Sequence, residues 1–166
     1  QDYLSQIERH LRERGWVDEA YTYWFDEPDK KDYEFVADGM KRIKAAAPGI
    51  KRMLTIQPEP PLLGHVEIWC GLAPKWTPEI VSERRQAGEQ VWWYICCAPH
   101  APYVTEFIDH AGTELRLWPW QSWQYGVTGI LLDPPYSDDQ HAVDYAAGGD
   151  VAAEVAAWAR DNGDNP

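Results

Sequence analysis

The sequence alternates between short apolar runs of strand length and longer segments with helical periodicity, and this alternation limits the fold more than any other feature. We count five such runs, at Ala20–Phe25, Lys51–Gln57, His65–Cys70, Val91–Cys97 and Thr128–Leu132. Strands that alternate with helices form parallel sheets. Near-continuous apolar runs indicate strands that are buried on both faces. The sequence therefore predicts an α/β fold with mostly parallel strands flanked by helices.

Helices are predicted before, between and after these strands. Three apolar residues recur at helical spacing within residues 3–14, which indicates an amphipathic helix. Thr77 and Pro78 are typical of a helix start, as an N-cap and a first helical residue. The other predicted helices cover residues 33–47, part of 107–126 and an alanine-rich segment at 151–160.

The predicted strands are too few for a complete barrel. An eight-stranded β/α barrel needs about 250 residues, whereas this chain has 166. Either the sheet is open, or the chain is part of a barrel that lacks three strands. The first element is a helix that leads into a strand, as in a barrel cut partway. We expect one domain over residues 1–166, with strand–helix units to about 133 and a divergent helical tail at 134–166.

Charge and cysteine content argue against several classes of function. The formal net charge is −12, which disfavours nucleic acid because neutralising phosphates needs clustered Lys and Arg. It equally disfavours anionic membrane surfaces, and no apolar run approaches the length of a membrane span. Three cysteines, Cys70, Cys96 and Cys97, show no zinc-binding spacing, so we expect buried thiols rather than a metal site.

Two adjacent carboxylates, Asp26 and Glu27, directly follow an aromatic run and precede Pro28. In parallel α/β sheets the chemistry lies at the carboxyl ends of the strands. Neighbouring carboxylates repel each other, so one is expected to hold its proton more tightly. That combination provides a general acid beside an anion, as glycosidic cleavage requires. The alternative is a solvated Asp-Glu-Pro turn.

The aromatic composition points in the same direction. The chain has 10 Trp and 9 Tyr but only 3 Phe. Rings with a polar group suit surfaces that are half apolar and half wet, and a sugar presents C–H faces together with hydroxyls. The alternative is that these rings serve packing alone.

Four segments together resemble a known family. AYTYWFDEP, HVEIW, GEQVWWYICCAP and LRLWPWQSWQYGVTGILL occur in this order, and they resemble the C-terminal half of the catalytic domain of glycoside hydrolase family 123, also described as domain of unknown function 4091. The resemblance runs from about residue 3 to residue 132. It implies the C-terminal portion of a (β/α)8 TIM-type barrel, with an Asp-Glu pair at the end of the fourth strand. The implied activity is that of an exo-β-N-acetylgalactosaminidase.

The resemblance also implies roles for individual residues. Glu27 would be the acid/base that protonates the leaving oxygen, and Asp26 would hold the N–H of the substrate's 2-acetamido group. The acetamido carbonyl would attack the anomeric carbon and form an oxazoline-type intermediate, so no metal or cofactor is needed. Supporting substrate contacts are expected from Tyr94, Trp69, Trp92, Trp118 and Arg116. Trp92 and Trp93 point to opposite sides of their strand, so at most one of them faces the site.

One observation on the residues agrees with this mechanism. Ordinary retaining barrel hydrolases carry a nucleophilic carboxylate on a second strand, but the corresponding segment VWWYICCAPH has none. A substrate that supplies its own nucleophile explains the gap, although Asp109 or Asp133 remains an alternative. The chain departs from the family after TGILL, where Asp133 and two prolines follow.

Two alternatives to this activity remain open at the level of sequence. One is a hydrolase that acts on a sugar without an acetamido group. The other is a non-catalytic carbohydrate-binding or truncated structural fragment of the same fold. In either case a glycan or glycoconjugate is the expected partner, with no nucleic acid and no membrane insertion. The resemblance implies a secreted or periplasmic location, and the sequence leaves the oligomeric state open.

Overall fold

A computed structural model describes residues 2–96, 98–105, 107 and 110–132. The chain divides into two units, residues 1–132 and residues 133–166, and the fold described below belongs to the first. Asp109, Asp133, Cys97 and the helix predicted at 151–160 lie outside the described residues.

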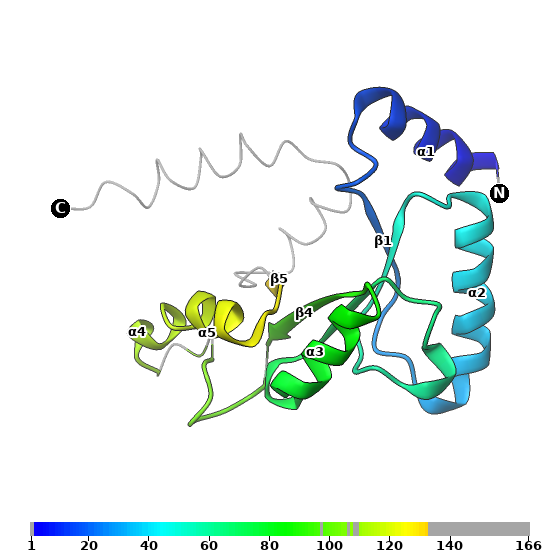
Figure 1. The fold of residues 1–166 in the computed structure, drawn as a ribbon. Helices are drawn as coiled ribbons and strands as arrows, with labels where there is room; N and C mark the ends of the chain where they lie inside the picture. The colour runs from blue at the N-terminus through cyan, green and yellow to red at the C-terminus, as the bar shows by residue number, and fades with distance from the viewer. Residues whose placement is uncertain (1, 97, 106, 108–109, 133–166) are drawn as a thin grey trace, which may run out of the picture. The chain divides into compact units, whose positions relative to one another are not determined.

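The first unit is built on one parallel sheet of five strands in the order β1-β2-β3-β4-β5 (Figure 1). The strands are β1 Tyr21–Phe25, β2 Lys51–Leu54, β3 Ile68–Leu72, β4 Gln90–Ile95 and β5 Gly129–Leu132. All five strands lie where the sequence predicts them, and the predicted α/β class is confirmed. Each strand follows its predecessor in space as well as in sequence, as in half of a β/α barrel.

The sheet is curled rather than flat. The rings of Tyr21 on β1 and Trp92 on β4 meet edge to face, with centroids 5.1 Å apart. Neighbouring strands lie about 4.8 Å apart, so three steps along a flat sheet would separate β1 from β4 by about 14 Å. Because side chains from these strands nevertheless touch, the sheet forms a half-barrel with a concave face.

Helices follow the predicted alternation with the strands. The α-helices are α1 Asp2–Arg14, α2 Tyr33–Ala46, α3 Pro78–Gln86, α4 Gly112–Leu115 and α5 Trp118–Tyr125. Three short 3-10 turns are η1 Lys30–Asp32, η2 Pro60–Leu62 and η3 Ala73–Lys75. The side chain of Thr77 accepts a hydrogen bond from the amide of Ile80 at 3.4 Å, as its predicted N-cap role requires. Pro119 lies at the start of α5, where the missing amide hydrogen of proline costs no helical hydrogen bond. The same proline would interrupt a helix that continued from α4 into α5.

The two faces of the sheet bury different sets of side chains. The face toward the helices carries Leu54, Trp69, Val91, Trp93 and Ile95, which pack with the apolar sides of α2, α3 and α5. The concave face carries a smaller cluster, listed by strand as Met53, Ile68, Cys70, Trp92, Tyr94 and Leu131. Trp92 and Trp93 therefore point to opposite faces, as predicted. Burial raises the pKa of the Cys70 thiol to about 12, which agrees with its predicted place in the interior.

An ion-pair network joins α2, β2 and β3 at the amino end of the sheet. Arg52 is 4% exposed, and its Nε lies 2.8 Å from Oε2 of Glu67. Lys44 of α2 reaches the other oxygen, Oε1, at 2.9 Å. Burial alone would raise the pKa of Glu67, but hydrogen bonds from Arg52 and Lys44 outweigh that effect and hold the pKa at about 2.

Candidate active site

The carboxylate pair follows β1, and an irregularity in that strand decides where it points. The register with β2 pairs Tyr23 with Met53 and then Phe25 with Leu54, so Trp24 has no counterpart on β2. Such a bulge shifts every later side chain to the other face of the strand. Phe25 consequently turns toward α2, where it lies so close to Gly39 that a Cβ there would come within 2.5 Å of the ring.

Asp26 therefore shares the concave side with Tyr23, three residues earlier. The Tyr23 hydroxyl donates a hydrogen bond to Oδ1 of Asp26 at 2.5 Å. Thr55, the first residue after β2, donates a second hydrogen bond to the same oxygen at 2.6 Å. A carboxylate with two hydroxyl donors is fixed in position and has its charge stabilised.

Glu27 is held through both its backbone and its side chain. Its amide donates a hydrogen bond to Oγ1 of Thr55 at 2.9 Å. Its φ is +36°, in the left-handed region that a residue with a side chain rarely adopts. Oε1 of Glu27 accepts a hydrogen bond from the hydroxyl of Tyr94, which lies on β4. The structure thus brings together Asp26, Glu27 and Tyr94, three of the residues that the sequence singles out.

Both tyrosines beside the carboxylates remain proton donors at ordinary pH. Burial raises the pKa of Tyr23, and its hydrogen bond to Asp26 raises it further. Burial likewise raises the pKa of Tyr94, and the carboxylate of Glu27 adds to the effect. Each phenol therefore keeps its hydrogen and presents it to a carboxylate oxygen.

Aromatic rings line the concave face next to this pair, but most of them are tyrosines. Tyr21, Tyr23 and Tyr94 project there together with Trp92, whose ring contacts Tyr21. Asp26 and Glu27 are themselves exposed, so solvent or a ligand can reach them from this side. The arrangement provides two fixed carboxylates beside flat rings that carry hydroxyl groups.

Three predicted substrate contacts lie elsewhere. Trp69 is completely buried on the helix side of the sheet, and its Nε1 donates to Glu89 at 2.8 Å. Trp118 is 3% exposed in the same core, with its ring 6.4 Å from that of Trp93. Arg116 is exposed at the end of α4. Trp69 and Trp118 do not join the concave face with the carboxylates, because they belong to the core on the helix side of the sheet.

Two residues of the site were not predicted from the sequence. The sequence predicts Thr55 inside a longer strand, whereas β2 ends at Leu54 and leaves Thr55 at the same sheet edge as Asp26. Tyr23 lies three residues before Asp26, an odd spacing that regular alternation assigns to opposite faces. The bulge at Trp24 places Tyr23 and Asp26 on the same face, but the residue types in this segment do not indicate a bulge.

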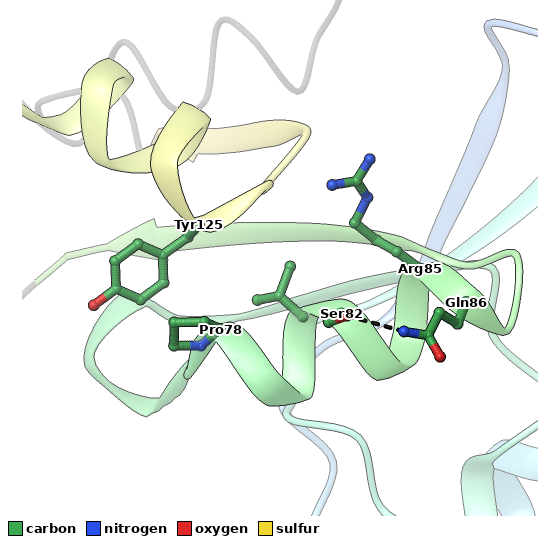
Figure 2. Close-up of a pocket in the computed structure, with 6 residues that line it drawn as sticks. Pro78, Ser82, Arg85, Gln86 and Tyr125 are labelled. Atoms are coloured by element: carbon green, nitrogen blue, oxygen red, sulfur yellow. Dashed lines mark hydrogen bonds between the residues drawn. The ribbon is translucent and has the colours of Figure 1, made fainter.

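The hollows among the described residues include two in the helix layer. One, of about 340 Å³, lies between α3 and the end of α5 (Figure 2), and its lining residues are Pro78, Val81, Ser82, Arg85, Gln86 and Tyr125. The Gln86 amide there donates to the Ser82 hydroxyl at 3.1 Å. The other, of about 160 Å³, shares Tyr125 and is walled mainly by prolines and aromatic rings. Asp26 and Glu27 line neither of these two hollows.

Within the described residues, no group of three or more His, Cys, Asp or Glu side chains is placed to hold a metal ion. In the same part of the chain, no helix has the length and apolar character that crossing a bilayer requires.

Comparison with known proteins adds one finding. The sequence model of a family described as glycoside hydrolase 123, catalytic domain, matches residues 1–148. No curated protein matches the chain at a significant level. The matched region contains every described residue of the sheet and of the carboxylate site.

Proposed function

The chain belongs to the family of the glycoside hydrolase 123 catalytic domain, and we propose that it releases terminal β-linked N-acetylgalactosamine, or a related N-acetylhexosamine, from glycans. Membership of that family makes the chain a glycosidase-type domain with glycan substrates. The choice of an acetamido sugar and of the mechanism is our proposal. It rests on the Asp-Glu pair at the end of β1, where each carboxylate has its own hydroxyl partner.

In the proposed reaction, Glu27 gives its proton to the leaving oxygen and later takes one from the attacking water. The donor hydroxyl of Tyr94 orients the Glu27 carboxyl between these two steps. Switching one carboxyl group between acid and base is what retaining glycoside hydrolysis requires.

Asp26 has the complementary task of orienting the substrate. Two hydroxyl donors already hold its Oδ1, which favours a carboxylate that accepts hydrogen bonds over one that transfers protons. It accepts the N–H of the 2-acetamido group and thereby turns the acetamido carbonyl toward the anomeric carbon. The carbonyl oxygen then attacks that carbon, the glycosidic bond breaks, and water opens the resulting oxazolinium ring.

The concave tyrosines suit this substrate. Tyr21, Tyr23 and Tyr94 offer apolar ring faces to sugar C–H groups and hydroxyls to its polar atoms. No second carboxylate occurs on β4, and an acetamido group that acts as the nucleophile makes one unnecessary.

Hydrolysis of an aryl N-acetyl-β-galactosaminide tests the proposal directly. Glu27→Gln should lower kcat by about 10²- to 10⁴-fold, the usual contribution of a general acid/base. Glu19→Gln, at an exposed position outside the site, is the matched control and should retain full rate. Full activity of Glu27→Gln would rule out the assignment.

The two alternatives predict different results in the same assay. A hydrolase for sugars without an acetamido group would cleave the aryl galactoside as fast as its N-acetylated analogue. A binding domain would take up N-acetylgalactosamine without releasing the aryl group. Asp26 and Glu27 are both exposed, and this favours the binding domain, because active sites that close around a substrate expel water.

A further inference from the structure

Two consecutive carboxylates do not naturally serve one site at the end of a strand. Successive side chains of an extended strand point to opposite faces. A regular continuation of β1 would therefore direct only one of Asp26 and Glu27 to the concave face. The backbone departs from that regularity twice, at the bulge around Trp24 and at the left-handed φ of +36° of Glu27.

Thr55 forms hydrogen bonds with both residues of the pair. Its hydroxyl donates to Oδ1 of Asp26 at 2.6 Å and accepts the amide hydrogen of Glu27 at 2.9 Å. A hydroxyl has one hydrogen and two lone pairs, so both bonds are made at the same time. The side chain is only 3% exposed, which limits competition from water.

The backbone conformation of Glu27 needs such a support. A left-handed conformation is unfavourable for a residue with a Cβ and persists only where its surroundings enforce it. The amide hydrogen that binds Thr55 belongs to that same residue. The hydrogen bond therefore acts at the point of strain.

We propose that Thr55 is a positioning residue that holds Asp26 and Glu27 together on the concave face. The catalytic part of this inference rests on the proposed function of the two carboxylates. The backbone part, that Thr55 maintains the turn at Glu27, is independent of the reaction. The two parts therefore have separate measurements.

The activity measurement compares Thr55→Val with Thr55→Ser. Valine keeps the shape and removes the hydroxyl, whereas serine restores it. We expect Thr55→Val to lower kcat on the aryl N-acetyl-β-galactosaminide by about 10- to 100-fold with a smaller change in KM, because misplaced carboxylates mainly affect the reacting geometry. Thr55→Ser should stay within about threefold of the original chain, and an equal kcat in both variants would overturn the catalytic part.

Thr22→Val is the matched control. Its hydroxyl also bonds across to β2, at 3.4 Å from the carbonyl of Lys51, but it does not contact the carboxylates. The substitution removes the same chemical group from the residue of β1 that precedes Tyr23. We expect its kcat to match that of the original chain, and a loss equal to that of Thr55→Val would show a general effect of deleting a hydroxyl.

Hydrogen exchange of the Glu27 amide tests the backbone part without any substrate. Loss of the acceptor in Thr55→Val should speed exchange at that amide by at least about tenfold, and Thr55→Ser should restore the original rate. Should Thr55→Val not fold, Thr55→Cys keeps the volume with a weaker acceptor and should give an intermediate rate. Unchanged exchange at Glu27 in the valine or cysteine variant overturns the proposal. An inactive original chain with faster exchange in the variant would instead refute the proposed function alone.

Discussion

At its amino end, β2 carries a buried arginine that pairs with a glutamate, whereas at its carboxyl end, three residues later, it meets two exposed carboxylates. Arg52 and Glu67 satisfy each other's charges, and Lys44 completes the group. At the other end, Thr55 bonds to the carboxylate of Asp26 and to the amide of Glu27, whose backbone conformation is unfavourable. The amino end is arranged for stability, whereas the carboxyl end tolerates strain, as active sites often do.

This contrast gives opposite expectations for substitutions at the two ends. Changes at the amino end should lower the free energy of unfolding and leave kcat unchanged as long as the chain is folded. Changes to the two carboxylates at the carboxyl end should lower kcat and change the free energy of unfolding by only about 1 kcal/mol.

The largest expected effect on stability comes from Glu67→Ala. It leaves the buried guanidinium of Arg52 without its carboxylate, and removing one partner of a buried ion pair costs about 3 to 5 kcal/mol. Because the Glu67 side chain is 27% exposed, we expect the lower end, about 3 kcal/mol, by urea unfolding. Glu19→Ala, at an exposed position, should change the free energy by less than about 0.5 kcal/mol. Equal losses in the two variants would break the comparison.

A smaller effect should appear as a dependence of stability on pH. The pKa of Glu67 is held at about 2 in the folded chain, below its ordinary value of 4.5. Its contribution is therefore complete above about pH 4.5 and is lost as the pH falls toward 2, because the unfolded chain takes up the proton first. Allowing for solvent screening, we expect about 1 to 2 kcal/mol over this range.

The measurement for this second prediction is urea unfolding of the original chain and of Glu67→Gln at several pH values. The other carboxylates titrate in both proteins, so the difference between the two curves reports Glu67. The original chain should lose stability more steeply below pH 4.5. Parallel curves would show that the amino-end network does not stabilise the fold through this charge.

The smallest effect concerns the backbone at Glu27. Glycine adopts a positive φ without penalty, so Glu27→Gly should be more stable than Glu27→Ala by about 1 kcal/mol, although both lack the carboxylate. Glu34, at an exposed position in the first turn of α2, is the matched control, because a helical backbone favours alanine over glycine there. Thermal or urea unfolding of the four variants measures this, and the same order of stability at both positions would contradict strain at Glu27.

Most of the fold could be predicted from the sequence because it depends on features that repeat. Alternation of apolar runs and helical patterns located all five strands and their parallel arrangement. The boundaries differ where a local contact competes with the sheet. The sequence predicts residues 55–57 as strand, but Thr55 lies beyond the end of β2, where it bonds to the Asp26 carboxylate and the Glu27 amide. His65 was predicted as strand too, but its amide bonds to Leu62 in a turn.

The site was predicted less completely, for two physical reasons. The position of Asp26 and Glu27 followed from a general rule on strand ends, and the partnership of Glu27 with Tyr94 follows from the curl of the sheet. Which tryptophans face the concave side depends on strand register, and Trp69 lies in the opposite phase from Trp92. The partnership of Tyr23 with Asp26 depends on one unpaired residue, which composition does not reveal.

The unpaired residue in β1 acts through its lack of a partner on β2 rather than through its identity. Trp24 is 62% exposed, so many side chains would fit at its position. If Trp24 were instead paired in a regular ladder, Phe25 would turn toward the concave face and Asp26 toward the helices. Deleting Trp24 should leave both directions as they are, because Tyr23, Phe25 and Asp26 would then alternate regularly. Related sequences should therefore vary freely at this position, and any that lack the extra residue should still carry the tyrosine and the aspartate on one face.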